Sequence, residues 1–252
     1  MIYDDLHLIT RWAQVVQLRD NDLLTPAELI LLDAAETGKA ARIGLTVPNL
    51  KAPTVLIRSA LLRYLILGGC ADFRTQPSGI TLVGAWISGV LDLSFTMARG
   101  PIDFFNCYLA ERPQFVQLTA DGVAMAGCTL TDGLNAARLQ ISGNVTLNGS
   151  RVDGKISLSG GEIKGHLSCT RAALRNENGS SFKAQGLKVA SSVLLEETTA
   201  TGQVSLLGSQ IGGQLVCIGA NFHNPNGHAL NAQSTQVRGD AFLRRATTTG
   251  EV

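Results

Sequence analysis

Large apolar residues recur every eleven positions along most of this chain. Val145, Ile156 and Leu167 keep that step, and apolar positions within a unit lie two residues apart, as in the run Val-x-Leu-x-x-Ser-x-Val that begins at Val145. A period of two is typical of β-strands, because successive side chains point to opposite faces. Each unit is therefore predicted to hold two very short strands, with a bend between them where Gly and Asn give the backbone the freedom that a corner needs.

Two such units, about 22 residues, are enough for one turn of a coil. We therefore predict a mainly β fold over residues 78–252, a right-handed parallel β-helix whose stacked turns bury one continuous core. The unit near Pro113 departs from the pattern, because Phe115, Val116 and Leu118 do not fit the template. A distorted turn is expected there.

A longer repeat, with one copy starting at His166 and the next at Gln214, overlies the short one. Residues 166–204 align without a gap on residues 214–252, an offset of two turns plus four extra residues, which lie at 176–179 and at 224–227. Both insertions end in Asn-Gly, the commonest dipeptide of tight turns. Two loops are therefore predicted to protrude from one edge of the rod, two turns apart. Their candidate interaction residues are Asn176, Asn178, Gly179, His223, Asn224, Asn226, Gly227 and His228.

The N-terminal residues 1–77 show helical spacing instead. A helix is predicted from about residue 4 to residue 18, a second begins at the capping box of Thr25 and Glu28, and a third runs from about Thr54 to Leu67. The third segment is apolar but short, whereas a membrane span needs about 20 apolar residues, so no membrane span is predicted. These helices are expected to cap the first turn, whose core and strand edges would otherwise be open.

The C-terminal end of the sequence shows no helical segment that could cap the last turn. The sequence stops at Val252 in mid-unit, where the preceding copy continues with residues 205–208. This favours either a fragment of a longer solenoid or an open edge that pairs with another chain. Self-association, or binding of a protein partner through this C-terminal edge, is therefore the expected interaction.

Charge and cysteine content narrow the function classes. Residues 78–252 carry 12 acidic and 13 basic residues and residues 1–77 carry eight of each, so neither the basic excess of a nucleic-acid binder nor a strong acidic excess is present. The start of the chain lacks the basic and apolar regions of a signal peptide. None of the five cysteines forms a Cys-x-x-Cys motif, and Cys169 and Cys217 fall on inward positions two turns apart, too far for a disulfide. Buried, reduced cysteines and a cytoplasmic location are expected.

Few residues offer chemistry. Asp92 and Asp103 should point outward on different sides of the rod, too separated for paired acid and base catalysis. The pair at 196–197 (Glu-Glu) aligns with the pair at 244–245 (Arg-Arg), which favours a stacked ion-pair ladder over a catalytic site. His223 and His228 flank the second insertion, but no further ligand completes a metal site. No catalytic residue, metal ligand or cofactor site is assigned.

Two segments carry a family resemblance. The run Ala-Thr-Gly-Gln-Val-Ser-Leu-Leu-Gly-Ser-Gln-Ile-Gly-Gly-Gln-Leu-Val-Cys from Ala200 to Cys217, and the run Asn-Pro-Asn-Gly-His-Ala-Leu-Asn-Ala from Asn224, resemble a family of uncharacterised bacterial proteins related to pentapeptide-repeat solenoids. Some members are labelled "membrane-associated oxidoreductase". The segments Leu24–Leu29 and Ile57–Gly69 are similar to the helical start of that family. The resemblance implies the solenoid fold and a bacterial source, and it brings no catalytic residues, although this chain repeats every eleven residues rather than five.

Three functions follow from these observations. The leading hypothesis is a non-catalytic interaction or self-assembly module that binds through its flat faces, its two loops or its C-terminal edge. A β-helix that binds or acts on polysaccharide is the alternative, with only two Trp and three Tyr available for stacking on sugars. The oxidoreductase implied by the family label is the third.

Overall fold

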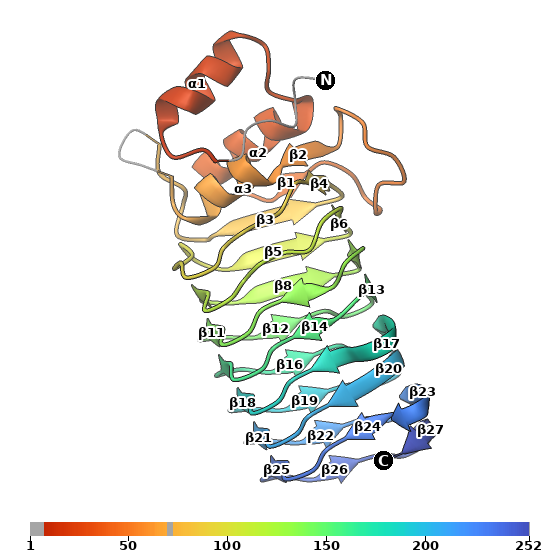
Figure 1. The fold of residues 1–252 in the computed structure, drawn as a ribbon. Helices are drawn as coiled ribbons and strands as arrows, with labels where there is room; N and C mark the ends of the chain where they lie inside the picture. Colours follow the sequence, from red (N-terminus) through yellow and green to blue (C-terminus); the bar gives the residue numbers. More distant parts are fainter. Residues whose placement is uncertain (1–7, 70–72, 252) are drawn as a thin grey trace.

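The computed structural model describes residues 8–69 and 73–251 as a rod of stacked parallel turns, with helices at its N-terminal end (Figure 1). Three sheets run along the rod, and consecutive strands of each sheet come from consecutive turns. The predicted parallel β-helix is therefore confirmed.

The nine-stranded sheet forms one side of the rod. Its strands, in spatial order, are β1 (Ala41–Arg42), β3 (Ile80–Val83), β5 (Ile102–Phe105), β8 (Val123–Ala126), β12 (Val145–Thr146), β16 (Leu167–Ser168), β19 (Val193–Leu194), β22 (Leu215–Val216) and β26 (Ala241–Phe242). The six-stranded sheet forms another side and consists of β7 (Thr119–Ala120), β11 (Gln140–Ile141), β15 (Glu162–Ile163), β18 (Lys188–Val189), β21 (Gln210–Ile211) and β25 (Gln236–Val237).

The twelve-stranded sheet bends around a corner, because β14 and β24 pair with the later halves of β17 and β20. Its members are β2 (Leu56–Arg58), β4 (Trp86–Ser88), β6 (Tyr108–Leu109), β9 (Thr129–Leu130), β10 (Leu134–Asn135), β13 (Arg151–Asp153), β14 (Ile156–Ser157), β17 (Ala173–Lys183), β20 (Thr199–Ser205), β23 (Asn221–His228), β24 (Leu230–Asn231) and β27 (Thr247–Glu251). A regular turn thus has four short strands, two for each eleven-residue unit, as the sequence predicts.

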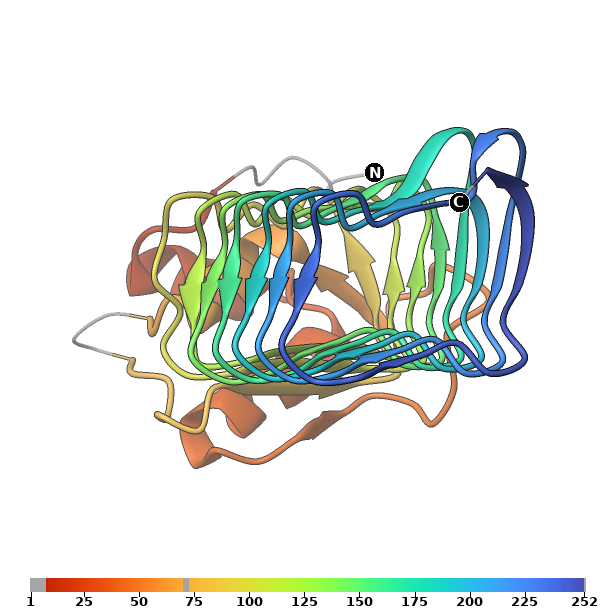
Figure 2. The same ribbon diagram turned by 90° about the horizontal axis from the view of Figure 1, so that it is seen from below.

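Strand register gives the length of each turn. Starting from Ile80, the successive partners along the nine-stranded sheet are Ile102, Val123, Val145, Leu167, Val193, Leu215 and Ala241. Most of these steps have the predicted length of about 22 residues. The step from Leu167 to Val193 and the step from Leu215 to Ala241 are each longer by the predicted four-residue insertion. Figure 2 shows both insertions projecting on the same side of the rod, at the end of the molecule away from the helices.

The expected distortion near Pro113 is not where the sequence placed it. Gln114 bridges Asp92 in the preceding turn and Asn135 in the next, and Phe115 is fully buried. The step from Ile102 to Val123 is one residue shorter than its neighbours, and the missing residue lies further on. Two residues separate Ala120 from Val123 at the corner between β7 and β8, whereas three separate the equivalent positions 141 and 145 in the next turn.

One corner position of each unit adopts a left-handed backbone conformation. It lies four residues after the first inward residue and is often glycine, as at Gly149 and Gly160. Several units place another residue type there with the same positive φ: Phe95, Asn106, Gln117, Arg138, Arg171, Glu197, Ser234 and Arg245. The corner geometry therefore repeats even where the residue best suited to it does not.

The helices are α1 (Trp12–Asp20), α2 (Pro26–Thr37) and α3 (Ser59–Ile66). The predicted start of the first helix falls on residues 1–7, outside the described residues, and the described part begins only at Trp12. The third prediction is wrong in its first part, because Leu56–Arg58 forms strand β2, paired with β4. A short apolar run suits a strand or a buried helix equally well, and here pairing with the next turn decides.

A buried ion pair joins α2 to the first turn. The predicted capping box is present, with Thr25 and Glu28 hydrogen-bonded through side chain and backbone in both directions. The Glu28 carboxylate, fully buried, also accepts hydrogen bonds of 2.7 and 2.6 Å from the guanidinium of Arg58. The N-terminal region thus contributes β1 and β2 to the stacked sheets, and its buried residues share one core with the turns that follow.

Candidate functional site: a trough on the six-stranded sheet

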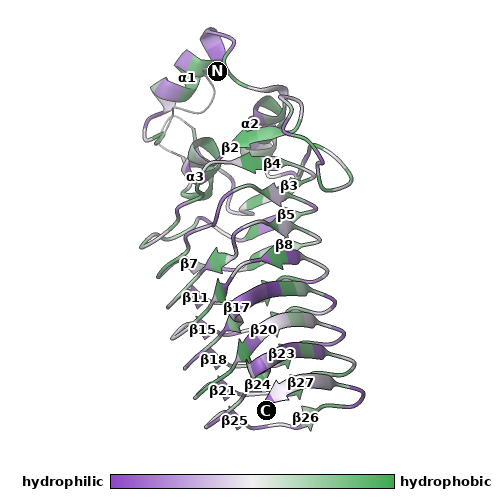
Figure 3. Ribbon diagram, turned by 45° about the vertical axis from the view of Figure 1, so that its right-hand side comes forward, coloured by the Kyte–Doolittle hydropathy of each residue, from purple (hydrophilic) through white to green (hydrophobic). Residues whose placement is uncertain are grey.

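The sequence-predicted loop residues lie in two protruding segments of β17 and β23. In each, an asparagine side chain donates a hydrogen bond of 2.8 Å to a backbone carbonyl four residues on, from Asn176 to Ser180 and from Asn224 to His228. Asn178, Gly179 and Asn226 are exposed at the tips, and Gly227 is half-buried. Figure 3 shows the protruding part of β17 to be hydrophilic.

The expected Asn-Gly tight turn does not form. Neither Gly179 nor Gly227 has a positive φ, which a type I′ turn requires at both central residues. The backbone instead stays extended, and the register with β20 shifts between Arg175 and Ser180 to accommodate the extra residues. The excursion is therefore a broad bulge in a continuous strand rather than a hairpin turn.

The two histidines are not brought together as ligands. His223 lies in the ladder opposite Thr201 and Thr249, whereas Nδ1 of His228 lies 3.2 Å from a carboxylate oxygen of Glu251. No group of three or more His, Cys, Asp or Glu side chains in the described part of the chain could hold a metal ion. The loops therefore offer exposed surface without a ligand cluster.

The ion pairs also differ in detail from expectation. Glu197 pairs with Arg171 of the preceding turn at 2.7 Å, because Gly219 occupies the corner between Glu197 and Arg245. Asp92 and Asp103 lie on different sides of the rod: Asp103 is on β5, and Asp92 bridges Gln114. Burial raises the pKa of the Asp103 carboxyl.

Four of the five cysteines lie within the described residues, and their thiols are in the core, whereas Cys70 lies outside the described residues. Cys107, Cys128, Cys169 and Cys217 are buried and unbridged. Desolvation raises the pKa of Cys169 and of Cys217 to about 12, so neither supplies a thiolate near neutral pH.

Sequence reasoning missed two neighbouring hollows on the six-stranded sheet. Figure 2 shows this sheet on the side of the rod away from the protruding loops. A hollow of about 350 Å³ lies over β7, β11 and β15, beside the shortened corner after Ala120. A second, of about 240 Å³, continues over β18, β21 and β25. We call this surface the trough.

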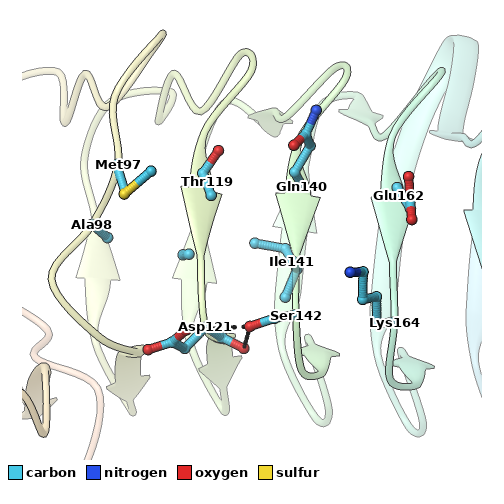
Figure 4. Close-up of a pocket in the computed structure, with 10 residues that line it drawn as sticks. Met97, Ala98, Thr119, Asp121, Gln140, Ile141, Ser142, Glu162 and Lys164 are labelled. Carbon is cyan, nitrogen blue, oxygen red and sulfur yellow. Dashed lines mark hydrogen bonds between the residues drawn. The ribbon is translucent and has the colours of Figure 1, made fainter.

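A single column of side chains follows the length of the trough, one from the first position of each strand. The column begins with exposed Met97 and continues through Thr119, Gln140, Glu162, Lys188, Gln210 and Gln236. Figure 4 shows its first four members standing on successive turns. The residue after each points inward and is apolar, as Ile141 and Ile163 are, so the core fixes the spacing of the column at about 4.8 Å per turn.

The polar side chains of the column have no bonding partner among the described residues. Among the described residues, the side chains of the six polar members form no hydrogen bond or ion pair. Elsewhere on the rod, outward polar side chains often bond to each other, as in Ser168 with Asn148 at 2.6 Å and Asn135 with Gln114 at 2.7 Å. The trough therefore presents a row of donors and acceptors that have no partner among the described residues.

No protein-family model, curated protein or solved structure matches the chain. No helix of the described residues is long and apolar enough to cross a membrane.

Proposed function

We propose that the protein is a non-catalytic recognition module that binds another protein along the trough. The observation that carries this proposal is the column of unbonded polar side chains at a fixed spacing on one uninterrupted sheet face. Such a surface is pre-organised, because each side chain stems from a strand held on both sides by the neighbouring turns. We prefer the trough to the C-terminal edge as the binding surface. Most of the trough is formed by complete turns that have a neighbouring turn on both sides, so its side chains are held in place.

The carboxylates of the trough are not placed as a close catalytic pair. Its two carboxylates, Asp121 and Glu162, belong to turns separated by a further turn, so their strands lie about 10 Å apart along the rod. Asp121 also accepts a hydrogen bond of 3.2 Å from Ser142. This placement does not favour the close carboxyl pair of a retaining glycosidase, at about 5 Å.

Polysaccharide binding has less support, because both tryptophan rings are already stacked on other rings of the protein. Trp12 stacks on Phe73 with ring centroids 4.2 Å apart, and Trp86 stacks on Tyr108 at 3.9 Å. Neither pair lines the trough. Sugar-binding surfaces use aromatic faces, and here those faces cover one another.

Site-specific photo-crosslinking in the source cells tests the proposal. A photo-crosslinking residue in place of Gln140 is expected to give one defined adduct with another protein. An excess of the natural protein without the crosslinker should compete for the partner and suppress this adduct. An excess of the Gln140→Ala/Gln210→Ala variant should suppress it poorly. The same residue at Ala124, on the nine-stranded sheet, serves as the control. Equal adducts from both positions, or none from Gln140, would contradict the proposal.

A further inference from the structure

The charges of the trough differ from those of the rest of the solenoid. Its two hollows are lined by three cations, Lys164, Lys188 and Arg238, and by two carboxylates, Asp121 and Glu162. A further hollow of about 480 Å³ at the edge of the trough adds Arg138. Subtracting these from the 13 basic and 12 acidic residues of 78–252 leaves nine and ten for all other surfaces. The positive charge is therefore concentrated in the trough.

Three cations of the trough form no ion pair among the described residues: Lys164 at the first hollow, and Lys188 and Arg238 at the second, although Lys188 lies opposite Glu162 in the strand ladder. Arg151 and Arg171, on other parts of the rod, pair with Asp153 and Glu197. Small residues, Ala190 and Gly212, lie beside Lys188 and Arg238 and leave the second hollow between the long side chains. An anionic group entering this hollow between Lys188 and Arg238, on the side away from Glu162, would meet two cations.

The opposite end of the trough is apolar. Phe95 is 71 % exposed and Met97 is 72 % exposed, both at the first turn of the trough. Phe95 holds a positive φ of 57° at a corner where three later turns have glycine, at Gly160, Gly186 and Gly208. A bulky residue in this conformation is strained by about 1 kcal/mol, so exposing the ring at this corner has an energetic cost.

Length and hydrogen-bonding chemistry limit the shape of the partner. From Met97 to Gln236 the column has seven members and six steps, so at about 4.8 Å per step it spans about 29 Å. About nine residues of extended chain cover that distance at about 3.3 Å each. The amides of Gln140, Gln210 and Gln236 can donate to and accept from a peptide backbone crossing them.

Building on the proposed function, we infer that the trough binds an extended acidic segment of the partner protein, with apolar side chains at one end. Its carboxylates lie on Lys164, Lys188 and Arg238, and its apolar end lies on Phe95 and Met97. A nucleic acid fits less well, because its phosphates recur along the whole backbone and would face Asp121 and Glu162, whereas a peptide can place uncharged residues there. The segment crosses the strands and is held by side chains rather than added as another strand.

Peptide binding measured by fluorescence anisotropy tests the inference. The probes are ten-residue peptides with blocked ends: ten glutamates, eight glutamates with two leucines at either end, and eight glutamines with two leucines. We expect the acidic peptides to bind, the leucines to strengthen binding in one orientation, and affinity to fall with added salt because the contacts are exposed charges. The glutamine peptide should bind at least about tenfold more weakly, a factor that corresponds to about 1.4 kcal/mol.

Matched variants locate the site. Lys188→Glu/Arg238→Glu should weaken the acidic peptides at least about tenfold, as loss of complementary charge does. Lys155→Glu/Arg175→Glu makes the same change of net charge at exposed positions away from the trough and should change affinity less than about twofold. Phe95→Ser/Met97→Ser should abolish only the gain from the leucines. Circular dichroism confirms that each variant is folded.

Each failure has its own meaning. Absence of acidic-peptide binding, or equal losses in both charge-reversed variants, overturns the inference, as does tighter binding of a single-stranded oligonucleotide than of any peptide. If the Gln140 crosslink persists when the peptides fail, the proposed function stands and the acidic class of the partner is wrong. If both the crosslink and the peptide binding are absent, the proposed function and the further inference are both wrong.

Discussion

The helical cap and the stacked turns secure their buried polar groups in different ways. In the cap, hydrogen bonds converge on one carboxylate, Glu28, from Thr25 and from both the backbone and the guanidinium of Arg58. In the turns, small hydroxyl side chains donate one by one to a carbonyl of the preceding turn, as Thr198 does to Cys169 and Ser209 does to Ala184. Stability is thus concentrated in a single cluster at one end and distributed over equivalent bonds along the rest.

Replacing Arg58 should cause the largest loss of stability, because it removes a central member of the cluster in the cap. Arg58→Leu leaves the buried Glu28 without its cation, which should cost about 3–5 kcal/mol in the free energy of unfolding. Arg171→Leu is the matched control, because it breaks an Arg–Glu pair on the exposed surface of a turn and should not shift the midpoint measurably. Urea denaturation followed by circular dichroism compares the two. Equal effects would show that the cluster in the cap has no special weight.

Two glycines sharpen the comparison within the turns. Gly202 lies under the first protruding loop with φ 97°, and a Cβ there would overlap the carbonyl oxygen of Asn176. Gly208 has φ 64°, and a Cβ there would meet no atom within 4 Å. Gly202→Ala should cost about 3 kcal/mol through overlap and backbone strain, and Gly208→Ala about 1 kcal/mol through strain alone. Thermal unfolding of both variants gives the difference, and similar costs would mean that the loop moves aside freely.

The sequence predicts the stacked turns better than it predicts the helical cap. In the turns, inward positions repeat, so Val145, Ile156 and Leu167 predict strands, turn length and the two insertions. The type of turn at Asn178-Gly179 is missed because the residues on both sides of the insertion, Arg175 and Ser180, pair with β20 and thereby constrain the backbone between them, against the preference of the dipeptide. In the cap nothing repeats, and the Leu56–Arg58 strand is decided by β4, which lies much later in the chain.

The trough has a weak signal in the sequence. Its column consists of residues of mixed type, from Met97 to Gln236, so no motif marks it. The step from Ile102 to Val123 is one residue shorter than its neighbours, and this irregularity indicates the shortened corner beside the first hollow. The charge of the trough cannot be predicted from the balanced composition, because cations about 22 residues apart meet only when the turns stack.

Shortening a looped turn should have a smaller effect. Deleting residues 176–179 removes the insertion between Leu167 and Val193 and gives that turn the length of its neighbours, so Phe182 keeps Val204 as its partner. We expect the fold to persist, with the unfolding midpoint lowered by a few degrees at most, about 1 kcal/mol in a protein of this size. The Gln140 crosslink should persist, because the loops lie on another side of the rod. Loss of the adduct would place the loops in the binding surface.

Replacing Asp103 should have the smallest effect on stability. Unlike a paired carboxylate, this group is expected to destabilise the fold when it ionises rather than when it is protonated. This half-buried carboxyl on β5 forms no hydrogen bond or ion pair in the part of the chain that the structure describes, and burial raises its pKa above the ordinary 3.8. Between 3.8 and the raised pKa, the folded state holds a proton that the unfolded state has lost. Ionisation of this group therefore lowers stability as pH rises through that window.

Replacement by the neutral isostere separates this contribution from those of all other acids. Asp103→Asn should be slightly more stable than the natural protein at pH 7, and the difference should vanish as the pH falls to about 3.8, the ordinary pKa of the group. Asp132→Asn, at an exposed position, controls for the loss of one negative charge. Urea midpoints measured from pH 3 to pH 7 decide the matter. A difference that grows at low pH would mean that the carboxylate stabilises the turn, and the coil would then contain a buried charge site comparable to that of the cap.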